Sequence, residues 1–200
     1  MEILLNLDTY LASAVKEYGI LVYVILFAII FLETGLVVMP FLPGDSLIFV
    51  AGTLAAAGLL DVAALFAMMT VAAIAGDTVN YRIGHHVGRS KIRFVKKEYI
   101  DKSSKFYERH GKKTIVIARF IPIIRTFAPF IAGVAKMDYK HFVSYNVIGG
   151  IAWVLAFLAA GYLFGNVDIV KDNLSLVIIV IIIVTLTMPI AEFVRHKSLK

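Results

Sequence analysis

The sequence contains no cysteine, which excludes disulfide bonds and thiol chemistry. It is also poor in charge: only 17% of its 200 residues are Asp, Glu, Lys or Arg, whereas 60% are hydrophobic. Soluble domains usually carry about 25% charged residues. Several uncharged runs are long enough to cross a bilayer, for which about 20 residues are needed. The chain is therefore predicted to be an integral membrane protein with one membrane domain and no room for a second, globular one.

Acidic residues are fewer than basic ones, and the excess of positive charge is concentrated in one segment. The net charge is +6, and residues 82–113 hold eleven of the twenty Lys and Arg residues. Apolar runs flank this segment and no nucleic-acid motif is present, so we interpret it as a basic cytoplasmic loop rather than a nucleic-acid site. Such a loop sets the topology and contacts anionic headgroups.

Groups that carry catalysis or bind metals are also missing. The histidines outside the His85-His86 pair are scattered, and no Ser/His/Asp set or metal-ligand set is recognisable. We therefore expect no cofactor, no metal and no enzymatic activity.

The apolar runs predict the order of the helices. Residues 1–17 place apolar side chains at helical spacing, which is typical of an amphipathic helix lying in the membrane interface. Further spans are expected over 18–38, 62–81, 142–167 and 173–191. Two apolar segments, near 35–60 and 115–140, are interrupted by prolines and charges. The domain plan is an interfacial helix (1–17), a membrane domain (18–165), and a last transmembrane helix with a basic tail (166–200).

Parity and charge assign a topology to these segments. If the basic loop and both termini are cytoplasmic, the two broken segments must each enter and leave on one side, from opposite faces. Both are then re-entrant helical hairpins. The segments also share a short motif, Phe49-Val50-Ala51-Gly52 and Phe130-Ile131-Ala132-Gly133. The expected fold is thus an all-α membrane protein built as an inverted repeat, as in many secondary transporters. Gly84-x-x-x-Gly88 and Gly161-x-x-x-Gly165 are candidate close-packing faces.

Four ionisable residues interrupt the apolar segments: Glu33, Asp45, Arg119 and Arg125. A charge at bilayer depth costs a few kcal/mol even on lenient scales, so such residues are functional candidates by default. Arginine offers a planar fork of donors that matches phosphate. Arg119 and Arg125 would point about 120° apart on an unbroken helix, and the intervening Pro122 breaks it. The alternative is that each arginine pairs permanently with Glu33 or Asp45.

The two acids differ in their settings. Glu33 ends an apolar run, where desolvation favours the protonated form, so it is the better candidate proton carrier. Asp45 follows Pro43-Gly44 and is equally consistent with a helix cap. Asp77 could pair with Arg82, and a structural role is favoured for it. Two residues of the 142–167 helix, Asn146 and Trp153, either line the cavity or pack in the core.

Several motifs, taken together and in order, make the sequence similar to a known family over residues 15–165. They are Phe31-Leu32-Glu33-Thr34-Gly35, Pro40-Phe41-Leu42-Pro43-Gly44-Asp45, Gly76-Asp77-Thr78-Val79-Asn80-Tyr81-Arg82-Ile83-Gly84, Phe106-Tyr107-Glu108-Arg109-His110-Gly111, Arg119-Phe120-Ile121-Pro122-Ile123-Ile124-Arg125, Ala132-Gly133 and Asn146-Val147-Ile148-Gly149-Gly150-Ile151-Ala152-Trp153. The chain resembles the DedA family of membrane proteins, which carries the domain also called VTT or SNARE-associated.

The resemblance implies a lipid carrier of the bacterial inner membrane. Family members have been linked to returning undecaprenyl phosphate across the membrane for cell-envelope synthesis, driven by the proton-motive force. It implies that Arg119 and Arg125 bind phosphate and that Glu33 and Asp45 act in proton coupling. The expected partners are an anionic lipid, protons and the bilayer, and a homo-oligomer is left open. Alternatives are an uncoupled phospholipid scramblase, a small-ion or solute exchanger, a lipid-modifying enzyme, and a structural protein whose charges serve assembly.

Overall fold

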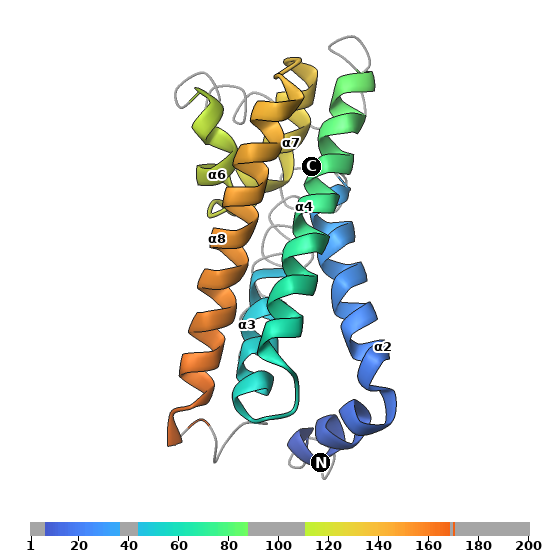
Figure 1. The fold of residues 1–200 in the computed structure, drawn as a ribbon, viewed down its shortest axis with the longest axis vertical. Helices are drawn as coiled ribbons and strands as arrows, with labels where there is room; N and C mark the ends of the chain where they lie inside the picture. Colours follow the sequence, from blue (N-terminus) through green and yellow to red (C-terminus); the bar gives the residue numbers. More distant parts are fainter. Residues whose placement is uncertain (1–6, 37–43, 88–110, 169, 171–200) are drawn as a thin grey trace, which may run out of the picture. The chain divides into compact units, whose positions relative to one another are not determined.

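The computed structural model describes residues 7–36, 44–87, 111–168 and 170. Within these ranges the secondary structure is entirely helical. The elements are α2 (Leu7–Gly35), α3 (Gly44–Ala56), α4 (Val62–Val87), the 3₁₀ turn η2 (Gly111–Lys113), α6 (Thr114–Ala118), α7 (Pro122–Val134) and α8 (Tyr139–Gly165) (Figure 1).

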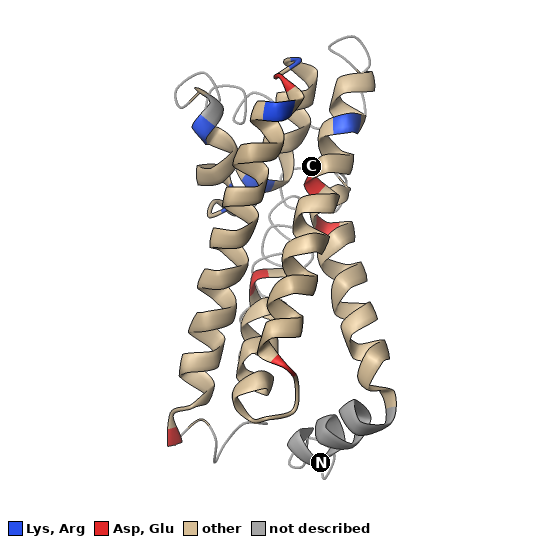
Figure 2. Cartoon of the chain, in the orientation of Figure 1, with Lys and Arg blue, Asp and Glu red and all other residues tan. Residues whose placement is uncertain are grey.

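Three of these helices are long and apolar enough to cross a membrane, namely Tyr18–Gly35, Val62–Val87 and Tyr139–Gly165. Figure 2 shows that they are almost free of charge along most of their length. Their exposed side chains are apolar: Ile20, Val71 and Leu163 are 83%, 58% and 69% exposed. Apolar side chains that face outward in this way suit a lipid environment, so the prediction of an all-α membrane protein is confirmed.

Helix α2 changes direction near residue 18, where the sequence placed the end of the interfacial helix. Tyr18 has non-helical backbone angles (φ −115°, ψ 20°) inside an otherwise continuous helix. Figure 1 shows the first part of α2 turning away from the part that follows. Helix α2 therefore bends at the residue where the sequence placed this boundary, and the separate interfacial helix stays a prediction.

Other boundaries differ from those expected. Helix α4 continues to Val87, so the basic loop predicted from Arg82 begins with a further turn and a half of helix. The first apolar span was extended to Val38, but α2 ends at Gly35. Hydropathy placed the end of α2 too late, because uncharged sequence continues past Gly35. It placed the end of α4 too early, because charged residues alone do not end a helix. The rest of the basic loop (88–110) and the predicted last span (173–191) lie outside the described residues.

The helices group into two units: residues 1–26, 43–66 and 156–200 in the first, and residues 27–42 and 67–155 in the second. In the first unit α3 crosses the end of α8 at two glycines. A Cβ on Gly161 would lie 2.0 Å from the Phe49 carbonyl oxygen, and one on Gly52 would lie 2.4 Å from the Leu158 carbonyl oxygen. The Thr53 hydroxyl also donates to the Gly161 carbonyl (3.2 Å). Only glycine permits this backbone approach.

The second unit contains a matching crossing between α7 and the end of α4. A Cβ on Gly84 would lie 2.1 Å from the Phe130 carbonyl oxygen, and one on Gly133 would lie 2.1 Å from the Tyr81 carbonyl oxygen. The repeated Phe-x-Ala-Gly motif therefore marks two helix crossings of the same design. The close-packing prediction is confirmed for Gly84 and Gly161, whereas Gly88 lies outside the described residues.

The turns that follow α3 and α7 are also built alike. Two residues after the end of each helix comes a residue with positive φ, Gly58 (74°) after α3 and Lys136 (53°) after α7. The next amide then bonds back to the last turn, from Leu59 to Leu54 and from Met137 to Ala132, both at 3.0 Å. An aspartate caps the following helix: Asp61 accepts from the Ala64 amide (2.6 Å) and Asp138 from the His141 amide (3.1 Å). The His141 amide lowers the pKa of the exposed Asp138 carboxyl below its ordinary value.

A break in the backbone separates α6 from α7. Helix α6 ends at Ala118, Arg119 is its C-cap, and α7 begins at Pro122. Ile121 is extended (φ −120°, ψ 106°), as expected for a residue before proline. The break therefore changes the direction of the chain between Arg119 and Arg125, as the sequence predicted.

Candidate functional site: two buried arginines

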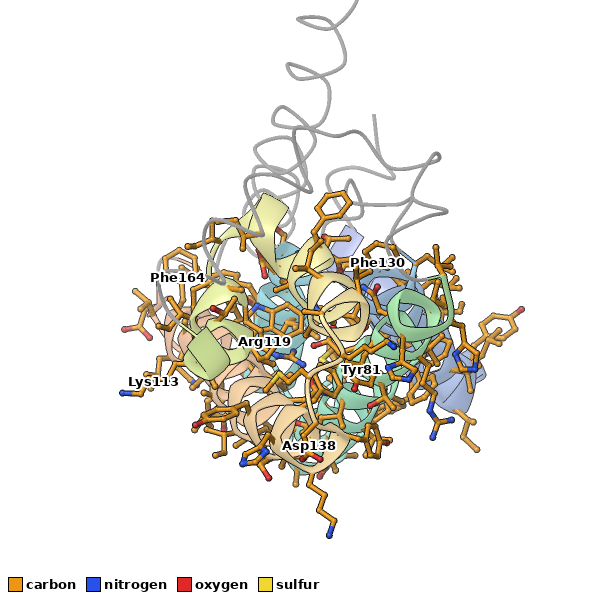
Figure 3. All side chains as sticks on the ribbon, turned by 90° about the horizontal axis from the view of Figure 1, so that it is seen from above. Tyr81, Lys113, Arg119, Phe130, Asp138 and Phe164 are labelled. Atoms are coloured by element: carbon orange, nitrogen blue, oxygen red, sulfur yellow. The ribbon has the colours of Figure 1, made fainter. Side chains whose placement is uncertain are left out.

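The second unit buries a group of polar and charged side chains among its apolar helices. Glu33 comes from α2, Asp77 from α4, Arg119 and Arg125 from either side of the α6–α7 break, and Asn146 from α8. Each side chain is at most 7% exposed. In Figure 3 Arg119 points into the interior of the helices, whereas Lys113 points away from them.

Arg119 is held by α4 and α8. Its Nη2 donates to the carboxylate of Asp77, and also to Oδ1 of Asn146 at 2.5 Å. The Asn146 amide is oriented in turn, because its Nδ2 donates to the Ile74 carbonyl (3.0 Å). Nε and Nη1 of Arg119 have no hydrogen-bond partner among the described residues.

The predicted pairing of Asp77 with Arg82 is wrong, because Asp77 pairs with Arg119. Residues five apart point about 140° apart on a helix, so Asp77 and Arg82 occupy different faces of α4. Arg82 is exposed, and its guanidinium lies 5.9 Å from the centre of the Tyr139 ring.

Two glycines of α8 make the space that Arg119 fills. A Cβ on Gly149 would lie 3.0 Å from Cδ of Arg119, and one on Gly150 would lie 3.6 Å from its Nη2. Gly149 and Gly150 belong to one of the family motifs, but no role was predicted for them. Two adjacent glycines within a long apolar helix, close to Asn146, were the available signal.

Arg125 is held by α2 and α8. Its Nη2 donates to Oε1 of Glu33 at 2.5 Å. The centre of the Trp153 ring lies 5.0 Å from Cζ of Arg125 and 5.8 Å from Cζ of Arg119. Trp153 is fully buried. One indole ring therefore lies near both guanidinium groups, and its π-system partly offsets the repulsion between them.

Asn80 connects the helices around the site and was missed as a candidate. Its Nδ2 donates to the carbonyls of Thr34 (3.0 Å) and Thr126 (2.8 Å), the residues that directly follow Glu33 and Arg125. Close to this point α2 and α4 nearly touch, since a Cβ on Gly76 would lie 1.9 Å from the Thr34 hydroxyl oxygen. Its place within the motif Gly76–Gly84 was the available signal in the sequence.

Asp45 was the remaining candidate from the sequence. It lies in the first turn of α3, in the first unit, and its side chain is half-buried. The structure thus brings Glu33, Arg119 and Arg125 together with the three accessory candidates from the sequence, Asp77, Asn146 and Trp153. The role of Asp45 in proton coupling stays a prediction.

Comparisons with known proteins agree with the resemblance. The family described as the VTT domain matches residues 42–163. Protein DedA of Escherichia coli (strain K12) is 51% identical over 204 residues, which cover 98% of this chain and 93% of that protein. Inner membrane proteins YghB and YqjA of the same strain are 32% and 33% identical, covering 76% and 74% of this chain and 72% and 70% of theirs. No solved structure matches. The chain is therefore a membrane protein that belongs to the DedA family and carries its VTT domain.

Proposed function

We propose that the protein is a lipid transporter that moves undecaprenyl phosphate across the bacterial inner membrane, coupled to the proton-motive force. The single observation that carries the proposal is the buried pair of arginines, Arg119 and Arg125, next to a backbone break. Charge this deep in an apolar chain is costly and calls for a function.

The chemistry of the pair suits an anionic headgroup. Guanidinium groups bind phosphate through planar, charge-assisted hydrogen bonds and stay protonated at any physiological pH. Each arginine is neutralised by a carboxylate, Arg119 by Asp77 and Arg125 by Glu33. A phosphate that binds these arginines therefore competes with the two carboxylates.

An inverted repeat is part of this proposal. The two glycine crossings, α3 on α8 and α7 on α4, and the two Asp-capped turns support it, since they repeat the same contacts at corresponding residues. In this arrangement α3 and the α6–α7 segment are the re-entrant hairpins, entering from opposite faces. The basic loop is then cytoplasmic. The start of α2 lies on the opposite side, because α2 and α4 run in the same direction: the Asp61 amide donates to the Tyr23 hydroxyl (2.8 Å), and Asn80 donates to the Thr34 carbonyl (3.0 Å). The cytoplasmic N-terminus expected from the sequence is therefore not part of this proposal.

Proton coupling is assigned to Glu33 and Asp45. Glu33 is buried and bonded to Arg125, so a phosphate that takes over Arg125 leaves a buried carboxylate that is stabilised by protonation. Asp45, in the first turn of α3, is proposed to act at a separate step.

Vesicle reconstitution tests the proposal. Translocation of a labelled polyprenyl phosphate is measured beside that of a labelled phospholipid, with and without a pH gradient, for wild type, Arg119→Ala and Arg125→Ala. Arg82→Ala is the matched control, because Arg82 is an exposed arginine on α4 outside the site. Gradient-dependent movement of the polyprenyl phosphate, at least tenfold slower in both site variants and normal in the control, is the expected result.

Two other outcomes would reject the proposal. Equal movement of both lipids without regard to the gradient would identify a phospholipid scramblase. Normal movement in both site variants would mean that the buried arginines serve only the assembly of the helices.

A further inference from the structure

The Nη2 atom, which Arg119 needs to bind a phosphate bidentately, is already hydrogen-bonded to other residues of the protein. A guanidinium binds phosphate bidentately along one of two edges, Nε with Nη2 or Nη1 with Nη2, so both edges include Nη2. In this site Nη2 donates to Asp77 and to Asn146, which occupies both of its N–H bonds. Nε and Nη1 have no partner among the described residues, but each alone offers a phosphate only a single contact.

We propose that Asp77 is a proton-operated gate on the anion site: it takes up a proton when a phosphate monoester displaces it from Nη2 of Arg119. The inference rests on the proposed function and extends it, because it assigns a second proton acceptor beside Glu33. The ligand class is a phosphate monoester on an apolar chain.

Charge balance at the site leads to the same conclusion. Asp77 on α4 forms an ion pair with Arg119, Glu33 on α2 forms one with Arg125, and α8 contributes the neutral Asn146 and Trp153. Two guanidinium groups and two carboxylates are neutral together. A phosphate monoester brings a charge of about −1.5 to −2 at neutral pH. Two protons, one on each carboxylate, would restore neutrality in this buried site, where unbalanced charge is costly.

The role of Asn146 differs from that of Asp77. Its Oδ1 cannot take a proton at physiological pH, and its Nδ2 is fixed on the Ile74 carbonyl. It therefore keeps one N–H of Nη2 engaged and holds the guanidinium in place when Asp77 leaves. Of the two groups on Nη2, only Asp77 can release it in response to pH.

The test counts the protons taken up when the purified full-length protein in detergent binds dodecyl phosphate. Titration calorimetry at about pH 8, where the monoester is dianionic, is run in buffers that differ in ionisation enthalpy. The variants are Asp77→Asn and Glu33→Gln, which keep the size and one acceptor oxygen. Asp138→Asn is the matched control, since asparagine also caps a helix and Asp138 is exposed outside the site.

We expect wild type and Asp138→Asn to take up about two protons per bound dodecyl phosphate and each site variant about one. Uptake in Asp77→Asn equal to that of wild type, or wild-type binding without uptake, would overturn the gate and leave the lipid-phosphate site standing. Absence of binding to wild type would instead reject the proposed function. If Asp77→Asn does not fold, the Glu33→Gln variant decides the question. Asp77 is then the carboxylate left to be protonated, so uptake of one proton supports the proposal and uptake of no proton refutes it.

Discussion

At the scale of residues, Trp153 stands out because one apolar side chain is placed near two positive charges. Its ring centre lies 5.0 Å from Cζ of Arg125 and 5.8 Å from Cζ of Arg119, and the ring has no exposed surface. An indole face attracts a cation by about 0.5–2 kcal/mol, more when water is excluded. We infer that Trp153 is a positioning residue that allows two like charges to lie in one small space.

Replacing Trp153 tests this role. Trp153→Leu removes the π-system, whereas Trp153→Phe keeps part of it. We expect Trp153→Leu to lower polyprenyl phosphate translocation about tenfold, which corresponds to roughly 1.4 kcal/mol of lost interaction. Trp153→Phe should retain more activity at a similar melting temperature. Equal activity of both variants at equal stability would show that Trp153 only fills space.

Most residues of the site could be found from the sequence, because charge in an apolar run is conspicuous. Glu33, Arg119 and Arg125 were found in this way, and the family motif added Asn146 and Trp153. The partner of Asp77 could not be found, since it depends on how α4 is rotated and which helix packs against that face. Asn80 escaped because an uncharged amide is unremarkable until both of its backbone partners are known.

At the scale of elements, the two glycine crossings are the feature on which the helix packing depends most. In each, a carbonyl oxygen lies where a Cβ of the facing glycine would be, at 2.0 Å for Gly161 and 2.1 Å for Gly133. The obstacle is backbone, so the neighbour cannot move aside as a flexible side chain would. Any side chain at these positions must push two helices apart.

We therefore expect Gly133→Ala and Gly161→Ala each to reduce the yield of folded protein severely. The loss of packing far exceeds the gain of about 1 kcal/mol that alanine brings over glycine within a helix. Gly19→Ala is the control, because a Cβ there meets nothing within 4 Å. Size-exclusion profiles and melting temperatures in detergent measure the effect. If both variants fold with wild-type stability, the crossings are looser than described.

The sequence predicted which elements form better than where they end. Hydropathy located α2, α4 and α8, since a bilayer demands long apolar helices. It could not place the end of α4, because Arg82 lies within the last turns of the helix, where an exposed charge is tolerated. The break before Pro122 was predicted correctly, since proline acts on the backbone directly.

At the scale of the whole molecule, an inverted repeat predicts the side of the membrane on which each turn lies. Ala57 and Lys136 are both exposed, in the turns that follow α3 and α7. The chain has no cysteine, so a single introduced cysteine is the only thiol. Lys136→Cys should react with an impermeant maleimide from the cytoplasmic side, and Ala57→Cys from the outside. Labelling of both from one side would contradict the inverted repeat.

The α3–α8 crossing has a consequence for synthesis of the protein. The Thr53 hydroxyl meets the Gly161 carbonyl across 108 residues of chain. At about 5–20 residues per second, a ribosome needs roughly 5–20 s to make that stretch. During this interval α3 has been synthesised, but the part of α8 that packs against it has not. For several seconds α3 of the nascent chain therefore lacks its packing partner and is open to wrong helix contacts and to degradation. We expect the insertion machinery to protect α3 during this time.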